Sequence, residues 1–176
     1  MFFKKKDLTA EKIYQNIVER SRSKFFYIDL FIDDTFESRF DLIIFHAFMV
    51  FYYYKQKELK DINLSQKIFD HMFGDFENNL REMGFGDIAV NKKMKIFVKA
   101  FYGRISKYSK SVDLYFSKKD KTLLKETILN NIYKGKINNK EAVGSFANYM
   151  VKNIIEFNRR SEQENIQSYF QFLKFY

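Results

Sequence analysis

Cysteine, proline and tryptophan are absent from this sequence, and glycine occurs only six times. Without cysteine, the chain has neither a disulfide framework nor a thiolate metal site. Folds built from β-strands usually need turn-forming residues at regular spacing, so the lack of proline and the scarcity of glycine favour helices joined by polar loops. A length of 176 residues fits one domain with a substantial core.

Basic residues outnumber acidic ones, which gives a formal net charge of +9. A basic protein can contact nucleic acid, the ribosome or an anionic membrane. AT-rich codons also produce an excess of Lys, Asn, Ile, Phe and Tyr, so charge alone does not identify the partner. Residues 1–6 contain lysines without a following apolar run, which is unlike a secretory signal. We therefore expect the cytoplasm of a bacterium.

Apolar residues recur at helical spacing along most of the chain. This periodicity predicts helices over Thr9 to Ser23, Ser38 to Lys57, Asn63 to Met83, Asn91 to Val112, Lys119 to Lys134 and Asn139 to Arg160. A linker is expected over residues 24–37, and a capping box at Ser161 and Glu164 predicts a short last helix to Lys174. Short loops between long helices indicate an all-α, single-domain irregular bundle of six to seven helices.

The helix predicted from Ser38 is the most apolar, with no charged residue between Asp41 and Lys55. Spanning a bilayer takes about 20 apolar residues, and this run has about 13. Because it is apolar on every side, we expect a central buried helix. His46 lies inside it and is interpreted as a hydrogen-bonded core histidine, with a ligand or pH-sensitive contact as the alternative.

Groups that could support catalysis or bind a metal are scarce. The two histidines, His46 and His71, lie on different predicted helices, and no Glu-x-x-His pattern accompanies them. The glycines at 84 and 86 are interpreted as a helix stop and a tight turn, because no strand and phosphate-binding loop surround them. We predict no catalytic residues, no metal site and no cofactor.

Carboxylates gather on the third predicted helix at Asp70, Asp75, Glu77 and Glu82. Asp70 and Glu77 are seven residues apart and share a face. Without a histidine companion they do not form a di-metal pattern, so a solvated face or ion pairs with neighbouring cations is the simpler interpretation.

The fourth predicted helix is basic on one side. Its apolar stripe runs from Met94 to Val112, and no acidic residue interrupts the other half, which carries Lys92, Lys93, Lys95, Lys99, Arg104, Lys107 and Lys110. Such a helix can lie on anionic lipid headgroups or on RNA phosphates. The alternative is a solvated outer face of the bundle.

Several short segments, in the same order along the chain, resemble the ubiquinol–cytochrome c chaperone family. The resemblance covers about residues 24 to 110 and leaves 113–176 less recognisable. Its segments are Asp34-Thr35, Arg39-Phe40-Asp41 with His46, Phe69 to Phe73, Leu80 to Asp87, Lys92 to Lys95 and Ala100 to Arg104. Asp33 stands where the family commonly has a proline.

The resemblance implies a non-enzymatic assembly factor for complex III that binds newly made cytochrome b at the inner face of the bacterial inner membrane. Ribosome binding and contact with an anionic membrane are further possibilities; DNA binding is not expected. Alternative functions are a ribosome- or RNA-binding module and a peripheral membrane adaptor, each using the basic helix.

We predict a partner-binding surface formed by Arg81, Glu82, Met83, Phe85, Asp87, Lys92, Lys95, Lys99, Tyr102 and Arg104. Arg39, His46, Asp70 and Gly84 are structural or functional candidates. Arg81 and Arg104 stand out in a lysine-rich chain, because arginine is a planar, multidentate donor. Each either contacts the partner or stabilises the bundle through an ion pair with Asp70, Asp75 or Asp87.

Overall fold

The computed structural model describes residues 9–57, 62–136, 140–162 and 170–175. These residues form six longer helices and one of five residues, with no strand among them. The helices are α1 (Thr9–Ser21), α2 (Lys24–Ile28), α3 (Phe36–Gln56), α4 (Ile62–Glu82), α5 (Asp87–Lys118), α6 (Thr122–Ile132) and α7 (Lys140–Arg160). The prediction of an all-α irregular bundle is confirmed.

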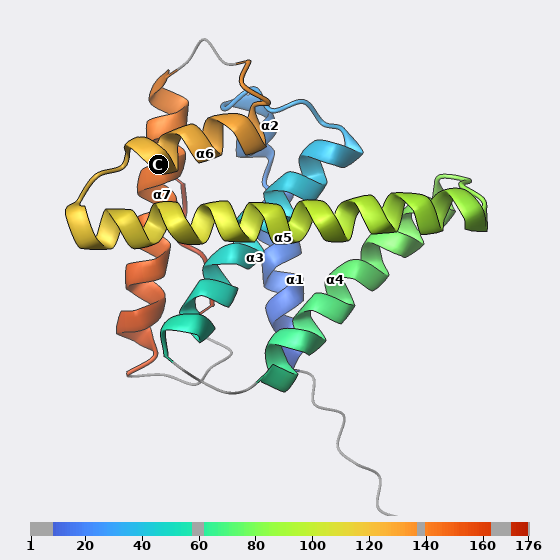
Figure 1. Cartoon of the computed structure of the whole chain (residues 1–176), viewed down its shortest axis with the longest axis horizontal. Helices are drawn as coiled ribbons and strands as arrows, with labels where there is room; N and C mark the ends of the chain where they lie inside the picture. The colour runs from blue at the N-terminus through green and yellow to red at the C-terminus, as the bar shows by residue number, and fades with distance from the viewer. Residues whose placement is uncertain (1–8, 58–61, 137–139, 163–169, 176) are drawn as a thin grey trace, which may run out of the picture.

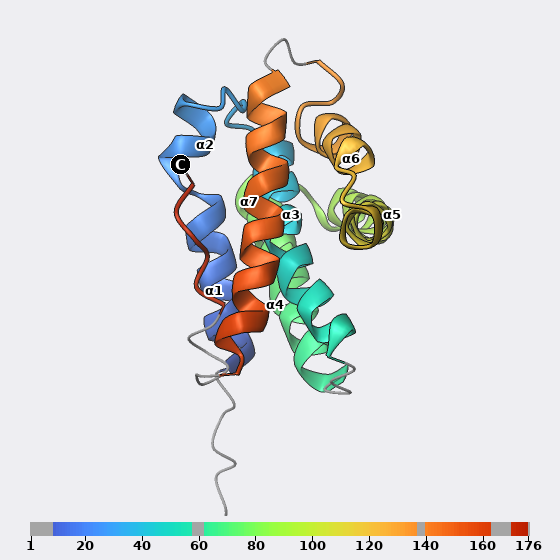
Figure 2. The ribbon, with the colours of Figure 1, turned by 90° about the vertical axis from the view of Figure 1, so that its left-hand side faces the viewer.

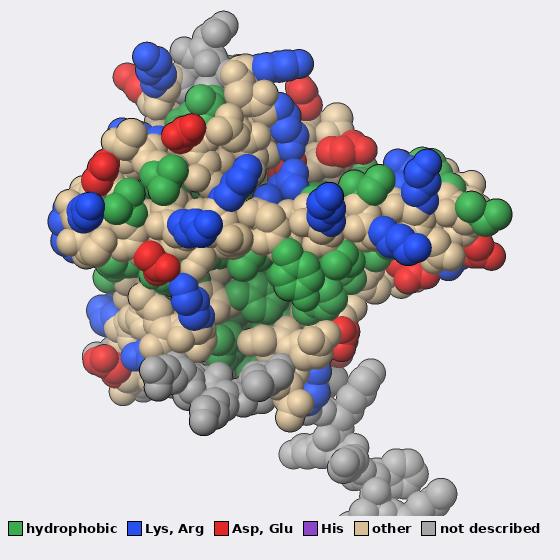
Figure 3. All heavy atoms as spheres, viewed as in Figure 1, with side chains coloured by type: hydrophobic (Ala, Val, Ile, Leu, Met, Phe, Trp, Pro, Cys, Tyr) green, Lys and Arg blue, Asp and Glu red, His purple; other side chains and the backbone are tan. Residues whose placement is uncertain are grey.

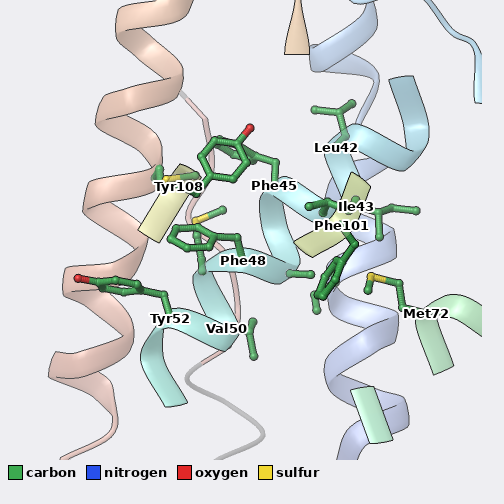
Figure 4. Packing of buried hydrophobic residues seen from close by; sticks show 14 of the residues in the cluster. Leu42, Ile43, Phe45, Phe48, Val50, Tyr52, Met72, Phe101 and Tyr108 are labelled. Carbon is green, nitrogen blue, oxygen red and sulfur yellow. The ribbon is translucent and has the colours of Figure 1, made fainter. Parts of the chain in front are cut away.

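Helix α3 lies at the centre of the bundle and contacts α1, α4, α5, α6 and α7 (Figure 1). Thr35 caps its N-terminus, since the Thr35 hydroxyl oxygen accepts a hydrogen bond from the backbone N–H of Ser38 at 3.2 Å. Residues on every side of α3 are buried, as predicted. Figure 4 shows Phe45, Phe48 and Tyr108 packed together in this core.

The connection between α4 and α5 is a glycine-terminated turn. Gly84 has a φ of 88°, a left-handed conformation that favours glycine. Its N–H donates to Arg81 O at 2.9 Å, and the Phe85 N–H donates to Leu80 O at 3.2 Å. These bonds satisfy carbonyls that the end of α4 leaves open, so Gly84 stops the helix as predicted.

Helix α5 is longer than predicted: it begins at Asp87 instead of Asn91 and ends at Lys118 instead of Val112. An aspartate in the first turn complements the helix dipole, and buried Val90 anchors that turn. The helix ends where Lys119 adopts a φ of 58°. In Figure 1, α5 crosses the front of the bundle, and its first turns project with the end of α4 on the right.

Two predictions for the connecting segments are wrong. Residues 24–28 form α2 instead of a linker, because Phe26 is fully buried against aromatic rings of α3 and α7. Residues 170–175 are not helical. The Leu173 backbone bonds to side chains of other helices: its N–H donates to Asn153 Oδ1 at 2.8 Å, and its carbonyl accepts from Arg20 Nη2 at 2.5 Å.

The remainder of that predicted last helix, including Glu164 of the proposed capping box, lies outside the described residues. The C-terminal segment, residues 170–175, runs along α1 and α7 in Figure 2. Phe170 is fully buried, and its ring lies 5.2 Å from that of Phe157. Tertiary packing of this kind overrides local helix preference.

Candidate functional site

A cleft of about 370 Å³ lies between the first turns of α3 and the last turns of α4. Its apolar wall is formed by Phe36, Phe40, Ile43, Phe76 and Met83. Its polar rim is formed by Arg22, Asp34, Thr35, Arg39, Asp75, Asn79 and Glu82. A hollow with this lining can accept an apolar side chain while its rim contacts charged or polar groups.

The α3 side of the cleft is fixed by a two-bond ion pair. Arg39 donates from Nε to Asp34 Oδ1 at 2.6 Å and from Nη2 to Asp34 Oδ2 at 2.9 Å. The hydrogen bond from Arg39 holds the pKa of the Asp34 carboxyl below its usual range. Together with the Thr35 cap, this pair holds the segment entering α3 against the start of the helix.

The α4 side is joined to α1 through Asp75. The Tyr14 hydroxyl donates to Asp75 Oδ2 at 2.6 Å, and Asn79 Nδ2 donates to Asp75 Oδ1 at 3.2 Å. Burial and the bond to Asp75 raise the pKa of Tyr14. Arg22, on the exposed rim, has no ion-pair partner in the described part of the chain. Its guanidinium is therefore available to a ligand.

Arg81 joins the end of α4 to the start of α5. Its Nη2 lies 2.8 Å from Glu77 Oε1, and its Nη1 forms an ion pair with Asp87. The bonds to Asp87 and Glu77 raise the pKa of Arg81. Asp87 is one of the partners that the sequence suggested. These pairs are exposed, so they position the turn at the surface without adding much stability.

The rest of that turn exposes apolar surface. Met83 is 58% exposed at the edge of the cleft. Phe85 is half-buried, and Lys93 Nζ lies 4.7 Å from the centroid of its ring. Glu82 lines the cleft beside Met83, so residues 81–87 combine charged and apolar groups around one end of the hollow.

Arg104 lies away from this turn and points into the bundle. Its Nη2 lies 2.7 Å from Asp41 Oδ1, and Lys134 forms an ion pair with the other oxygen of Asp41. Asp41 is only 2% exposed, and its burial raises the pKa of the carboxyl. The ion pair expected as one alternative for Arg104 therefore exists, with a partner that was not among those predicted.

His46 is fully buried and hydrogen-bonded, as the core interpretation predicted. Its Nδ1 lies 2.8 Å from Leu42 O and 3.0 Å from Ser21 Oγ, and its Nε2 lies 3.3 Å from the Tyr149 hydroxyl. Burial lowers the pKa of His46 to about 3, although the bond to the Leu42 carbonyl opposes this. The imidazole is therefore neutral at physiological pH. Asp70, by contrast, is on the surface, where it accepts from Gln66 Nε2 at 2.7 Å.

The other predicted site residues, Lys92, Lys95, Lys99 and Tyr102, are exposed on α5. Tyr102 also lines a second hollow of about 400 Å³ between α3, α4 and α5. Its aromatic lining includes Phe51, Phe69 and Phe101 and forms part of the green patch below α5 in Figure 3. The sequence did not reveal this hollow, because Phe69 and Phe101 fall on helix stripes that a core also requires.

No group of three or more metal-ligating side chains is found within residues 9–57, 62–136, 140–162 and 170–175. None of the described helices is long and apolar enough to cross a bilayer.

The sequence model of the ubiquinol-cytochrome C chaperone family matches residues 29–172. The chain belongs to this family. The match includes α6 and α7, which lie beyond the segments that carry the short-motif resemblance. None of the curated proteins compared with the chain matches it.

A solved structure has a similar fold: the crystal structure of the Cbp3 homolog from Brucella abortus. It has a TM-score of 0.74 and 24% sequence identity, and the alignment covers 96% of this chain and 88% of that one.

Two family-like segments that are distant in sequence line the same cleft. Asp34, Thr35 and Arg39 come from the first, and Glu82 and Met83 come from the second. Folding brings them to one hollow because α3 and α4 pack together near the cleft. This convergence makes the cleft the leading candidate for the functional site.

Proposed function

We propose that this protein is an assembly chaperone for ubiquinol–cytochrome c reductase that binds newly made cytochrome b beside the bacterial inner membrane. Membership of the ubiquinol-cytochrome C chaperone family supports the role in assembling this complex. The observation that carries the binding site is the convergence of the two family-like segments on the cleft between α3 and α4.

The chemistry of the cleft suits an unfinished membrane subunit. Apolar side chains of a membrane segment need temporary cover, and the wall formed by Phe36, Phe76 and Met83 supplies aromatic rings and a thioether. Methionine adapts to side chains of different shape. Arg22 and Glu82 on the rim offer charges of both signs to the polar residues that flank a membrane segment. Binding of this kind requires no reaction.

The test is to place a charge on the apolar edge of the cleft. Met83→Asp introduces a carboxylate at a 58% exposed position, where it should not disturb folding. We expect cells that carry only this variant to lose cytochrome b from affinity-purified chaperone and to lose b-type haem absorbance, because an apolar segment rejects a buried carboxylate.

Ile155→Asp is the matched control, since Ile155 is 50% exposed on α7 and does not line the cleft. It should retain cytochrome b and complex III. Equal loss in both variants would assign the effect to general damage and contradict the proposed site. Normal complex III in cells that lack the gene would contradict the proposed function itself.

A further inference from the structure

Helix α5 has an outer face that its packing in the bundle does not use. Its buried side is formed by Val90, Phe97, Phe101, Tyr108 and Val112. At about 100° per residue, the exposed residues Ile88, Lys92, Lys95, Ile96, Lys99 and Tyr102 fall within an arc of about 120° on another side. Lys110 falls in the same arc, and Lys107 lies about 20° beyond its edge. We call these eight residues the outer face of α5.

Within the part of the chain that the structure describes, no acidic residue neutralises the positive charge of the outer face. No acidic residue occurs between Asp87 and Asp113, and both of these carboxylates have partners: Asp87 pairs with Arg81, and Asp113 with Lys55. Among the described residues, the five lysines of the outer face take part in no ion pair. Figure 3 shows basic side chains along α5 on the visible side of the molecule.

Exposed isoleucines interrupt these lysines. Ile88 is 88% exposed and Ile96 is 57% exposed, although the same helix buries a separate apolar stripe. Tyr102, 60% exposed, continues the apolar part of the face towards the aromatic hollow. A purely solvated helix face gains nothing from such residues, whereas a helix lying in a lipid interface buries them.

The position of α5 leaves the face accessible. In Figure 2, α5 is seen end-on at the right-hand edge of the molecule, with no helix outside it. From residue 88 to residue 110 the face extends about 33 Å in a straight line. A planar surface can therefore contact its whole length.

We infer that the outer face of α5 docks the protein on an anionic membrane surface, with the lysines at the level of the lipid phosphates and Ile88, Ile96 and Tyr102 at the boundary of the acyl chains. RNA would also attract the lysines, but aliphatic side chains contribute little to phosphate binding, and RNA-binding surfaces usually add stacking aromatics in their place. This docking site is separate from the cleft, so it does not depend on cytochrome b being the client.

Flotation of the full chain with vesicles tests the inference. We expect the protein to float with vesicles of phosphatidylcholine and phosphatidylglycerol, and not with phosphatidylcholine alone. Since each lysine near an anionic surface strengthens binding about fivefold, K95E/K99E should weaken binding to the vesicles by at least about 25-fold. I88S/I96S should lose the part of the binding that persists at high salt, because insertion of apolar groups is not screened.

K125E/K152E is the matched control, since it makes the same change in net charge at exposed lysines of α6 and α7. It should float nearly as well as the unmodified chain, and circular dichroism should show every variant folded. Equal loss in K95E/K99E and K125E/K152E would reduce the effect to net charge and overturn the inference. So would absence of flotation, or face-dependent binding to a single-stranded RNA without binding to vesicles.

Copurification of cytochrome b with the same variants separates the two proposals. If K95E/K99E no longer binds vesicles but still copurifies with cytochrome b, the outer face of α5 binds membranes independently of the client site. If the unmodified chain floats and cells lacking the gene still build complex III, the docking face survives and the proposed function fails.

Discussion

The region around His46 buries its large apolar side chains, whereas the turn between α4 and α5 exposes them. Around His46, aromatic rings from α2, α3, α7 and the C-terminal segment enclose one another, with Phe26 5.6 Å from Phe146 and 5.7 Å from Phe175. At the turn, Met83 and Ile88 face solvent, and exposed ion pairs position the chain. The first region maintains the fold, and the second presents a surface.

This difference shows that a high aromatic content does not by itself indicate a binding surface. The chain is 19% aromatic. Among the described residues, 17 of these rings are buried in one continuous core, and 11 more are partly buried against it. Among the described rings, those that reach the surface, such as Tyr102 at 60% exposure, are available to a partner. Substitutions in the two regions should therefore affect different measurements.

The largest effect is expected from matched truncations of one ring in each region. Phe26→Ala should lower the free energy of unfolding by about 4 kcal/mol, because it leaves a cavity in the enclosed cluster. Phe85→Ala should cost about 1 kcal/mol, since that ring is half-buried. Denaturant unfolding gives both values. Similar losses would remove the distinction between the two regions.

Substitutions of Arg104 and Arg81 should likewise differ in their effect on stability. Arg104→Ala leaves the buried carboxylate of Asp41 with Lys134 alone, which should cost about 2 to 3 kcal/mol of unfolding free energy. Arg81→Ala should leave thermal unfolding almost unchanged, because its ion pairs are exposed. If Arg81→Ala nevertheless loses cytochrome b in a pull-down, Arg81 acts in binding. An unstable Arg81→Ala would instead give it a structural role.

The free energy of unfolding should depend on pH because His46 is buried in the enclosed region. Its pKa is about 3 when folded and 6.5 when exposed, so between these values the unfolded chain binds more protons. The contribution of His46 to the free energy of unfolding is fully present above pH 6.5. It falls as the solution becomes more acidic, by about 2 kcal/mol between pH 7 and pH 5.

His46→Gln should flatten that part of the profile, because it removes the buried imidazole. Urea unfolding at several pH values measures the effect. An unchanged profile in His46→Gln would mean that another group causes the acid sensitivity.

The smallest effect is expected for Asp34→Asn, which weakens the ion pair with Arg39 on the rim of the cleft. Both side chains are 54% exposed, so the melting temperature should hardly move. The α3 side of the cleft should loosen, and amide hydrogen exchange at residues 35–38 should become faster. Unchanged exchange would show that the Thr35 cap alone holds this segment.

Periodicity was enough to predict the fold because the chain is locally consistent. The apolar run of α3 identified the central helix, and Gly84 identified the end of α4. Tertiary contacts decided what it missed. Helix α2 forms because Phe26 is buried, and residues 170–175 are not helical because Arg20 and Asn153 bind the Leu173 backbone. Neither contact has a local pattern.

The site was less predictable than the fold. Short motifs identified Arg39, Glu82 and Met83 but could not show that one cleft unites them. Asp41 could have been identified as the partner of Arg104 by one sign, since a lone carboxylate at the start of an apolar helix requires a cation. Which lysines and isoleucines of α5 are exposed depends on how the helix is rotated, and packing alone sets that rotation.

Helix α5 continues for 32 residues without an interruption, from Asp87, which pairs with Arg81, to Lys118, beyond the end of its outer face at Lys110. It therefore acts as a rigid beam with no joint between its two ends. A membrane bound along the side of α5 would therefore also fix the direction in which the cleft between α3 and α4 opens. Docking through the outer face would in this way orient the cleft relative to the membrane.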